Sequence, residues 1–204
     1  MHRDELLDLF RRSGALLEGH FRLTSGLHST GYLQCALVLQ DPPSAGRLGA
    51  EIASRVRGLR PTVVLSPALG GVIIGHEVAR ALGVRALFAE RQDGVLTLRR
   101  GFTLSEPDRV LVVEDVLTTG GSTRETMQVA AAAGGQVVGA ASIVNRSGRP
   151  AQTLAVGDGG GASAFDVPFV ALLDIDIPTY QPDACPLCAK GLPVVKPGSR
   201  PVVA

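Results

Sequence analysis

Apolar residues recur at near-helical intervals over the first part of the chain. The apolar positions of this stretch are Leu6, Leu7, Leu9, Phe10, Leu16 and Leu17. Because spacings of three and four residues place side chains on one face of a helix, the pattern predicts a helix over residues 3–17 that ends near Gly19. Two short strand-like runs follow at residues 21–24 and 32–35, and residues 25–29 between them have the composition of a turn.

Beyond residue 41, strand-like and helix-like patterns alternate. Asp41, followed by two prolines, is a helix start signal. The apolar stripe of that helix consists of Leu48, Ile52 and Val56. Strands are predicted at residues 62–66, 85–89, 109–114, 136–144 and 165–177, and helices at residues 72–82, ended by Gly83, and 122–133. Residues 95–104 indicate a hairpin or a mobile excursion. This alternation is typical of an α/β fold with a central, mostly parallel sheet flanked by helices.

The length of 204 residues suits one domain with a small appendage. We expect a single domain over residues 1–182 and a Pro-rich tail with a CxxC motif over residues 183–204. The composition predicts poor order after Tyr180. Residues 157–161, which are four glycines and an aspartate, predict a flexible loop.

Composition and charge exclude several classes of partner. The chain is 45% hydrophobic and 19% charged, with 20 Lys and Arg against 19 Asp and Glu. This balance provides no basic face for nucleic acid. The first residues lack the apolar core of a signal peptide. The most membrane-like stretch, residues 127–144, contains two consecutive glycines and reads better as a helix, a turn and a buried strand. We therefore expect a cytoplasmic protein that binds neither nucleic acid nor membrane.

Three cysteines are too few for a disulfide framework. Cys185 and Cys188 form the CxxC motif, and Cys35 lies far away in the sequence. Since a tetrahedral zinc site needs four ligands, a complete site would require Cys35, histidines or a second subunit. A thioredoxin-type redox role is disfavoured, because such motifs open a helix after a strand rather than a Pro-rich tail. The motif therefore favours structural thiols, with a metal site or a disulfide as open alternatives.

The most strand-like run of the chain ends in a group of polar residues. Glu114 and Asp115 follow the apolar residues 110–113, and a loop of threonines, glycines and serine at residues 118–122 then opens a predicted helix. In open α/β sheets, ligands bind at the carboxyl ends of the strands. A glycine-containing loop at a helix N-terminus presents backbone N–H groups to one point, where the helix dipole favours an anion. The pattern predicts a phosphate site.

The two acids beside this site indicate what carries the phosphate. Carboxylates repel a phosphate unless they face hydroxyl groups or a metal ion, so a ribose diol held between Glu114, Asp115 and the loop suits the arrangement. No Gly-x-x-x-x-Gly-Lys-Ser/Thr pattern occurs, which excludes a Walker loop. The alternative is an ordinary strand-to-helix turn in which Thr118, Thr119 or Ser122 caps the helix. A cap needs only one such residue, and we therefore favour a sugar-phosphate site.

Residues 112–122 resemble the motif with which type I phosphoribosyltransferases bind 5-phosphoribosyl-1-pyrophosphate (PRPP). The resemblance implies that the loop binds the 5′-phosphate, that the two acids bind the ribose hydroxyls, and that Mg²⁺ is held mainly by the pyrophosphate, with Asp115 a candidate protein ligand. The implied PRPP-binding residues are Glu114, Asp115, Val116, Leu117, Thr118, Thr119, Gly120, Gly121 and Ser122, together with Leu69, Gly70 and Arg91. The candidate catalytic residues among them are Asp115, Glu114 and Arg91, since a carboxylate stabilises an oxocarbenium-like transition state.

Two further segments resemble orotate phosphoribosyltransferases. Residues 19–29 resemble a segment that in this family forms part of a small N-terminal hood over the base, which implies that Ser25 and Gly26 contact orotate. Arg146, at the end of a predicted strand, matches the arginine that pairs with the orotate carboxylate. The planar guanidinium suits a carboxylate, because it donates two parallel hydrogen bonds. Thr118 is the remaining implied orotate contact. A surface arginine after a strand is the alternative for Arg146.

Other family segments are altered in this chain. Residues 67–71 resemble the pyrophosphate loop, but the family commonly has Tyr-Lys where this chain has Leu69 and Gly70. The hood segment often carries Lys in the place of Thr24.

The mobile catalytic loop is the most altered segment. The family usually has Arg-Lys-x-x-Lys-x-His-Gly, and residues 90–94 stand in the matching place. Arg91 can be carried over, whereas the second lysine and the histidine have no counterpart. In the family this loop reaches across a homodimer to the pyrophosphate of the neighbour. Arg99 and Arg100 are candidates to supply the missing charge, and a solvated basic strand edge is the alternative.

Together these resemblances imply a type I phosphoribosyltransferase fold whose hood comprises residues of about 1–40 and part of the C-terminal region. They imply a Mg²⁺-dependent, homodimeric enzyme of de novo pyrimidine (UMP) biosynthesis that converts PRPP and orotate to orotidine 5′-monophosphate and pyrophosphate. A purine or uracil phosphoribosyltransferase is one alternative, which the hood segment and Arg146 disfavour. A non-catalytic PRPP-sensing regulator is another, which the altered loop would suit.

Overall fold

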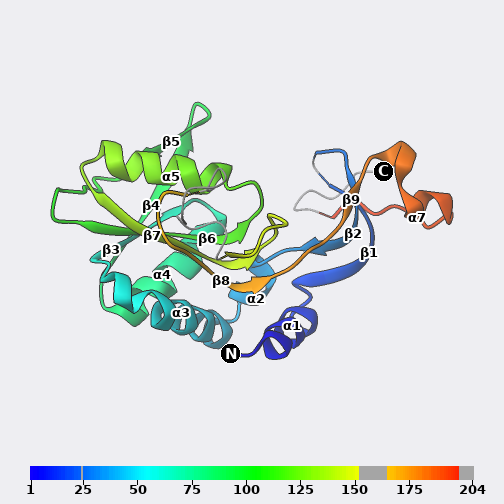
Figure 1. The fold of residues 1–204 in the computed structure, drawn as a ribbon, viewed down its shortest axis with the longest axis horizontal. Coiled ribbons are helices and arrows are strands. Elements are labelled where there is room, and N and C mark those ends of the chain that lie inside the picture. The colour runs from blue at the N-terminus through cyan, green and yellow to red at the C-terminus, as the bar shows by residue number, and fades with distance from the viewer. Residues whose placement is uncertain (24, 152–164, 198–204) are drawn as a thin grey trace.

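A six-stranded sheet with helices on both faces forms the larger part of the molecule in the computed structural model, which describes residues 1–23, 25–151 and 165–197 (Figure 1). The strands are β3 (Val63–Pro67), β4 (Arg85–Gln92), β5 (Val95–Leu98), β6 (Arg109–Leu117), β7 (Gln136–Asn145) and β8 (Phe169–Asp174). Their order is β5-β4-β3-β6-β7-β8, and all neighbours are parallel except β4 and β5. This arrangement confirms the predicted mostly parallel sheet.

Three helices cover the main sheet. α3 (Pro42–Val56) and α4 (Gly70–Leu82) lie on one face and α5 (Gly121–Ala132) on the other (Figure 1). The predicted start of α3 is confirmed, because the Asp41 carboxylate accepts a hydrogen bond from the backbone N–H of Ser44 at 3.0 Å. Its predicted apolar stripe is fully buried. Gly83 ends α4 in the left-handed conformation, as predicted. None of the described helices is long and apolar enough to cross a membrane.

The central strands β3 and β6 are buried on both faces. Val63, Val64 and Leu65 in β3 have no exposed surface, and neither do the apolar residues 110–113 in β6. Side chains on both faces of these strands therefore pack into a core, which explains why the strands are continuous apolar runs. Leu65 pairs with Val112 in parallel, so the carboxyl ends of the two strands lie at the same edge of the sheet. This pairing brings together the loops that follow them.

A second, smaller sheet lies beyond the carboxyl ends of the main strands (Figure 1). This small sheet consists of β1 (Leu16–Arg22), β2 (His28–Leu33) and β9 (Thr179–Tyr180), all antiparallel. The helix α1 (Arg3–Arg12) precedes it, and the short helix α2 (Ala36–Leu39) links it to α3. The sheet therefore combines the N-terminal residues with a segment from near the C-terminus.

The predicted first helix was too long. α1 ends at Arg12, and Gly14 adopts a φ of +69° that favours glycine. Leu16 and Leu17 belong to β1, where they pair with Leu33 and Tyr32. Apolar residues at this spacing fit a strand or a helix, and the left-handed glycine decides between them. The two predicted strands are likewise displaced toward the N-terminus, while Thr24 and the predicted flexible loop at residues 157–161 lie outside the described residues.

Residues 95–98 form β5, which makes a hairpin with the preceding strand β4, whereas residues 102–104, the other part of the predicted hairpin, form no strand. The turn of the hairpin consists of Asp93 and Gly94, which both have positive φ values, of 51° and 85°. Two left-handed residues match the type I′ turn, whose twist suits an antiparallel pair. The segment matched to the mobile catalytic loop therefore forms the end of a paired strand and its turn.

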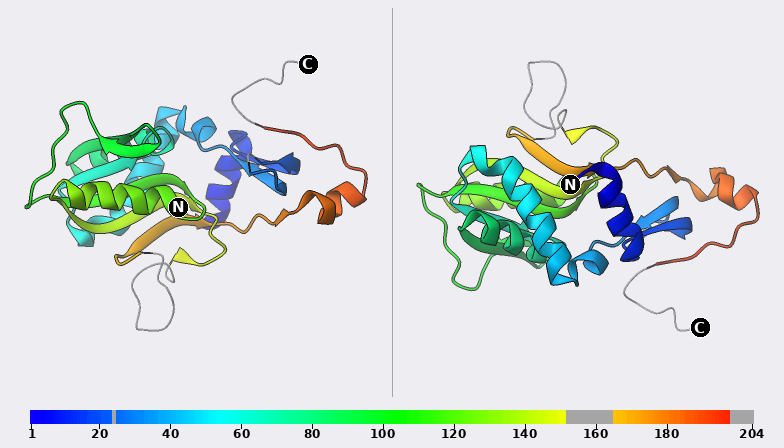
Figure 2. Two further views of the ribbon diagram at one scale, coloured as in Figure 1. Left: turned by 90° about the horizontal axis from the view of Figure 1, so that it is seen from above. Right: turned by 90° about the horizontal axis from the view of Figure 1, so that it is seen from below.

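The expectation of poor order after Tyr180 was wrong for residues 181–197. This segment contains a short 3-10 helix, η2 (Pro182–Ala184), and the short helix α7 (Pro186–Ala189). After α7 the chain turns back, as the red segment of Figure 2 shows. Val195 pairs with β1, where its N–H donates to the carbonyl of His20 and its carbonyl accepts from the N–H of Arg22, both at 2.8 Å. Pro-rich composition alone suggested disorder, but pairing with a distant strand supplies the missing backbone partners.

The contact between α3 and α4 yields a test of the fold. A Cβ atom at Gly49 would lie 2.7 Å from the backbone carbon of Glu77, whereas one at Gly46 would lie 2.9 Å from the flexible guanidinium of Arg80. We expect Gly49→Ala to lower the free energy of unfolding by about 1–3 kcal/mol, because the helices must separate. Gly46→Ala, the control in the same helix, should be neutral or stabilising by roughly 0.5–1 kcal/mol. Urea denaturation measures both, and equal effects would contradict the close approach.

Candidate active site

The loop between β6 and α5 leaves the N-terminus of α5 without a side-chain cap. Gly120 occupies the N-cap position of α5 with a φ of +76°, and a Cβ atom there would lie 3.1 Å from the ring of Phe165. Glycine provides no side chain to cap the helix, so its first N–H groups keep donors for a ligand. Thr118 and Thr119 are exposed beside them. We call residues 117–122 the cradle.

Glu114 is bound to the first turn of α5. Its Oε1 accepts a hydrogen bond from the hydroxyl of Ser122 at 2.9 Å, and its Oε2 accepts one from the hydroxyl of Thr123 at 2.7 Å. Burial raises the pKa of Glu114, although these two hydrogen bonds oppose the shift. The hydroxyl of Ser122 therefore serves the acid rather than the helix cap, which argues against the ordinary-turn alternative. Sequence reasoning missed Thr123, although it directly follows the loop.

Asp115 lies where the cradle meets the loop after β3. Its Oδ1 accepts a hydrogen bond from the N–H of Val116 at 2.9 Å, and its side chain has no side-chain partner among the described residues. A Cβ atom at Gly70 would lie only 2.6 Å from this oxygen. Burial raises the pKa of Asp115. Of the two acids, Asp115 is the one with lone pairs available to a ligand.

The loop at residues 67–71, predicted to bind pyrophosphate, approaches β6 closely. Leu69 precedes α4 with 89% of its surface exposed, and its peptide bond to Ala68 is cis. A Cβ atom at Gly71 would lie 2.8 Å from the carbonyl oxygen of Val113. Gly70 and Gly71 therefore leave room for the carboxylate of Asp115 and for the backbone of β6.

Arg146 follows β7 at the same edge of the sheet. Its backbone N–H donates to the carbonyl of Leu117 at 2.7 Å, which joins it to the cradle. Its side-chain Nε is buried and has no hydrogen-bond partner among the described residues. Burial lowers the pKa of Arg146, and nearby Asp176 opposes that shift. This donor is therefore available to an acceptor from outside the chain, a water molecule or a ligand.

The basic residues of the hairpin differ in their contacts. Arg91 pairs with Glu125 of α5 through two hydrogen bonds of 2.8 and 3.1 Å, so the structure places it against the side of this helix. Arg100 donates two hydrogen bonds of 2.7 Å to Glu90. Arg99 is exposed, and no polar contact of its side chain occurs within the described ranges. Glu125, which binds both Arg91 and the hairpin backbone, was not foreseen from the sequence.

The predicted orotate contacts Ser25 and Gly26 lie in the turn between β1 and β2. Gly26 has a φ of +86°, and its N–H donates to the carbonyl of Leu23 at 2.9 Å. The N–H of Leu23 in turn donates to the carbonyl of Leu27 at 2.8 Å, which closes the turn. The small sheet presents this turn on the side of the main sheet where the strands end (Figure 1).

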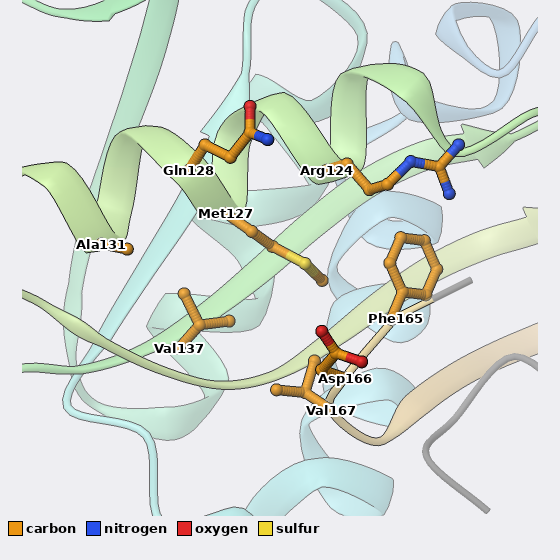
Figure 3. Close-up of a pocket in the computed structure, with 8 residues that line it drawn as sticks. All are labelled: Arg124, Met127, Gln128, Ala131, Val137, Phe165, Asp166 and Val167. Atoms are coloured by element: carbon orange, nitrogen blue, oxygen red, sulfur yellow. The ribbon is translucent and has the colours of Figure 1, made fainter. Parts of the chain in front are cut away.

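A pocket on the outer side of α5 is separate from the cradle. It has a volume of about 330 Å³ and lies between α5 and the residues before β8 (Figure 3). The guanidinium of Arg124 lies 5.9 Å from the ring of Phe165 at one end of this pocket and donates to the carbonyl of Thr119 at 2.8 Å. The lining is mainly apolar, and its polar residues are Arg124, Gln128 and Asp166. Arg124 nevertheless supports the cradle loop from behind.

Comparison with known proteins agrees with this arrangement. Residues 38–156 match the phosphoribosyl transferase domain family. Curated orotate phosphoribosyltransferases of Pelotomaculum thermopropionicum and Heliobacterium modesticaldum are 52% and 51% identical, covering 99% and 98% of this chain and 100% of each relative. The structure of the Aeropyrum pernix orotate phosphoribosyltransferase has a TM-score of 0.63 and 27% identity, covering 83% of this chain and 93% of its own. The structure of the Mycobacterium tuberculosis H37Rv orotate phosphoribosyltransferase in complex with PRPP has a TM-score of 0.65 and 24% identity, and the match covers 84% of this chain and 95% of that chain.

These findings confirm the predicted type I phosphoribosyltransferase fold and the orotate activity over the purine, uracil and regulatory alternatives. Since curated relatives match half of its residues along its whole length, the chain belongs to the orotate phosphoribosyltransferases, which transfer the 5-phosphoribosyl group of PRPP to orotate in pyrimidine biosynthesis.

Proposed function

We propose that Asp115, the cradle and Arg146 divide the work of phosphoribosyl transfer between them. In this reaction the bond from the anomeric carbon to pyrophosphate breaks, and a ring nitrogen of orotate forms the new bond to that carbon. The observation that carries the proposal is the convergence of one available carboxylate, uncapped helix N–H groups and an unpartnered guanidinium N–H at one edge of the sheet.

The cradle is proposed to bind the 5′-phosphate of PRPP. The first N–H groups of α5 are free of a side-chain cap, and the helix dipole favours an anion there. Hydrogen bonds to a charged group contribute about 1.5–3 kcal/mol each. Thr118 and Thr119 add exposed hydroxyls. A relative of the same fold binds PRPP, which supports this assignment.

Asp115 and Glu114 are proposed to act differently. Glu114 is occupied by the hydroxyls of Ser122 and Thr123, so it holds the cradle in position under the ribose. Asp115 is free to accept from the ribose hydroxyls and to stabilise the positive charge that develops at the anomeric carbon. Its oxygens also fit Mg²⁺, which prefers carboxylate and phosphate oxygens and usually keeps few protein ligands. When bound, Mg²⁺ would neutralise charge on the pyrophosphate.

Arg146 is proposed to bind the carboxylate of orotate. Its buried Nε–H lacks a partner among the described residues, and nearby Asp176 opposes the lowering of its pKa by burial. A carboxylate would satisfy the donor, and a neutral purine or uracil would leave it unpaired, at a cost of about 1–3 kcal/mol. Ser25, Gly26 and Thr118 are proposed to contact the remainder of the base.

The leaving pyrophosphate needs positive charge, for which Arg99 is the best placed hairpin residue. Arg100 is held by Glu90, and Arg91 would have to break its double hydrogen bond with Glu125 in order to act. Arg99 has no such bond to lose. We further propose that the enzyme is a cytoplasmic homodimer in which the hairpin of one protomer reaches the site of its partner.

An orotate turnover assay tests the proposed function. With PRPP and Mg²⁺ we expect the absorbance of orotate to fall as orotidine 5′-monophosphate forms, and we expect a chelator to abolish this turnover because the pyrophosphate loses its counter-ion. Uracil and purine bases serve as controls and should not be consumed. Binding of PRPP without turnover of orotate would contradict the proposal.

Asp115→Asn should separate catalysis from binding. Because its negative charge stabilises the transition state, we expect kcat to fall by roughly 10²-fold or more, a magnitude typical of losing one electrostatic stabiliser, while the KM for PRPP changes much less. Asp8→Asn on the exposed face of α1 is the matched control. A rise in the KM for PRPP with unchanged kcat would assign Asp115 to binding alone.

The same substitution should stabilise the ligand-free fold at neutral pH. Burial raises the pKa of Asp115 above its unfolded value, so the folded chain binds more protons between the two values. Its contribution to stability therefore falls as the pH rises through the folded pKa. We expect the Tm of Asp115→Asn to exceed that of the native chain at neutral pH and the difference to narrow toward about pH 3.9, the ordinary pKa of aspartate. Equal Tm values at neutral pH would contradict the buried charge.

Arg146→Ala should act on the acceptor. Because a charged, hydrogen-bonded pair would be lost, we expect the KM for orotate to rise by roughly 10- to 150-fold, the equivalent of about 1.5–3 kcal/mol. The KM for PRPP should change little. Arg149→Ala, an exposed arginine of the same loop, is the control and should leave both constants unchanged. An unchanged KM for orotate in Arg146→Ala would refute the assignment.

A further inference from the structure

Two histidines and two cysteines from distant parts of the chain meet beside the small sheet. His20 lies in β1 and His28 begins β2, while Cys185 is the N-cap of α7 and Cys188 lies within this helix. One potential ligand atom from each of the four residues lies within 4.8 Å of all the others. The histidines thus supply the second pair of ligands that the CxxC motif lacks in the sequence.

The separations of these atoms match a tetrahedral metal site. His20 Nε2 lies 3.6 Å from Cys185 Sγ and 3.7 Å from Cys188 Sγ, and His28 Nδ1 lies 3.2 Å from Cys188 Sγ. The two ring nitrogens are 2.9 Å apart. With zinc–sulfur bonds of about 2.3 Å and zinc–nitrogen bonds of about 2.0–2.1 Å, tetrahedral ligand atoms lie roughly 3.3–3.8 Å apart. Binding of zinc would need only small displacements.

The protonation of His20 favours a metal over hydrogen bonds alone. His20 Nδ1 lies 2.9 Å from the carbonyl oxygen of Leu192, an acceptor, so this nitrogen carries the proton and Nε2 keeps its lone pair. A backbone carbonyl on the far side of the ring is the usual way in which a metal-binding histidine is oriented. Three other atoms approach Nε2, yet one lone pair accepts a single hydrogen bond. A central cation would instead use a lone pair from each of the four groups.

We propose that His20, His28, Cys185 and Cys188 bind a structural zinc ion. Imidazole and thiolate are the ligands that zinc prefers, and four protein ligands leave no position for a substrate. His20, His28 and Cys185 are at least 94% buried, as a closed site requires, and Cys188 covers the side toward solvent. Cys35 lies elsewhere in the core and takes no part.

The proposed zinc ion would hold the turn of the small sheet in place. His20 and His28 lie on either side of residues 23–27, and Val195 pairs with the backbone beside His20. Zinc would therefore join both strands of this turn to the C-terminal segment. This consequence rests on the proposed orotate contacts at Ser25 and Gly26, whereas the metal site itself does not. Loss of zinc should then raise the KM for orotate more than the KM for PRPP.

Metal analysis of the full chain, purified without a polyhistidine tag, tests the site directly. We expect about one zinc ion per chain, as a site with four ligands implies, and protection of Cys185 and Cys188 from a thiol reagent until a chelator is added. Co²⁺ in place of zinc should give the intense visible absorption of tetrahedral coordination together with a thiolate charge-transfer band. Metal-free protein, whether with two reactive thiols or with a Cys185–Cys188 disulfide, would overturn the proposal.

Matched variants locate the ligands. Cys188→Ala and His28→Ala should lose the zinc, whereas Cys35→Ala and His76→Ala should retain it. If Cys188→Ala and His28→Ala both retained zinc, the assignment would be overturned. If these two variants fail to fold, the Co²⁺ spectrum of the native chain tests the ligands instead, because it reports sulfur and nitrogen ligation without a substitution. If the native chain binds zinc but removal of the zinc leaves the KM for orotate unchanged, the metal site is supported and only the role of the turn is refuted.

Discussion

The parallel pairing of β3 with β6 is the interaction on which the site depends. Both strands are buried on both faces, so a slip in register would move the polar residues that follow the apolar runs, such as Glu114, into the core. Because parallel strands end at the same edge, the pairing places Gly70 against Asp115 and so joins the two loops that follow. β7, the next strand in the sheet, brings Arg146 to the same edge by a backbone hydrogen bond to Leu117. A core built from apolar residues thus determines where the polar groups of the site meet.

Within that edge, two adjacent acids have acquired different surroundings. A strand directs successive side chains to opposite faces, so Glu114 reaches the first turn of α5 while Asp115 lies beside the loop of α4. Burial raises the pKa of both. Two hydroxyl donors oppose the shift at Glu114, whereas only backbone N–H groups oppose it at Asp115. The two acids therefore differ in the side chains that hold them, although they are adjacent in the sequence.

Local signals predicted the main sheet well and the remainder less well. Asp41, Gly83 and the apolar run before Glu114 each act through their own neighbours, and the structure confirms all three. Leu16 and Leu17 were misassigned because their spacing suits either type of element, and strand pairing decides it. Two contacts join residues that lie far apart in the sequence: Arg91 with Glu125, and His20 with Cys185. Such contacts are products of the folded chain, and periodicity carries no information about them.

The small sheet also has a consequence for how the protein is made. Its β9 strand and the Val195 segment pair with residues near the N-terminus, and His20 meets Cys185 across 165 positions of the chain. The strands of the main sheet all precede β9, so they can leave the ribosome and begin to pack while β1 and β2 still lack these partners. Closing so long a loop is slow, and the exposed edge of β2 is open to wrong pairing in the interval. The strands β1 and β2 are therefore synthesised early, and their pairing is completed late.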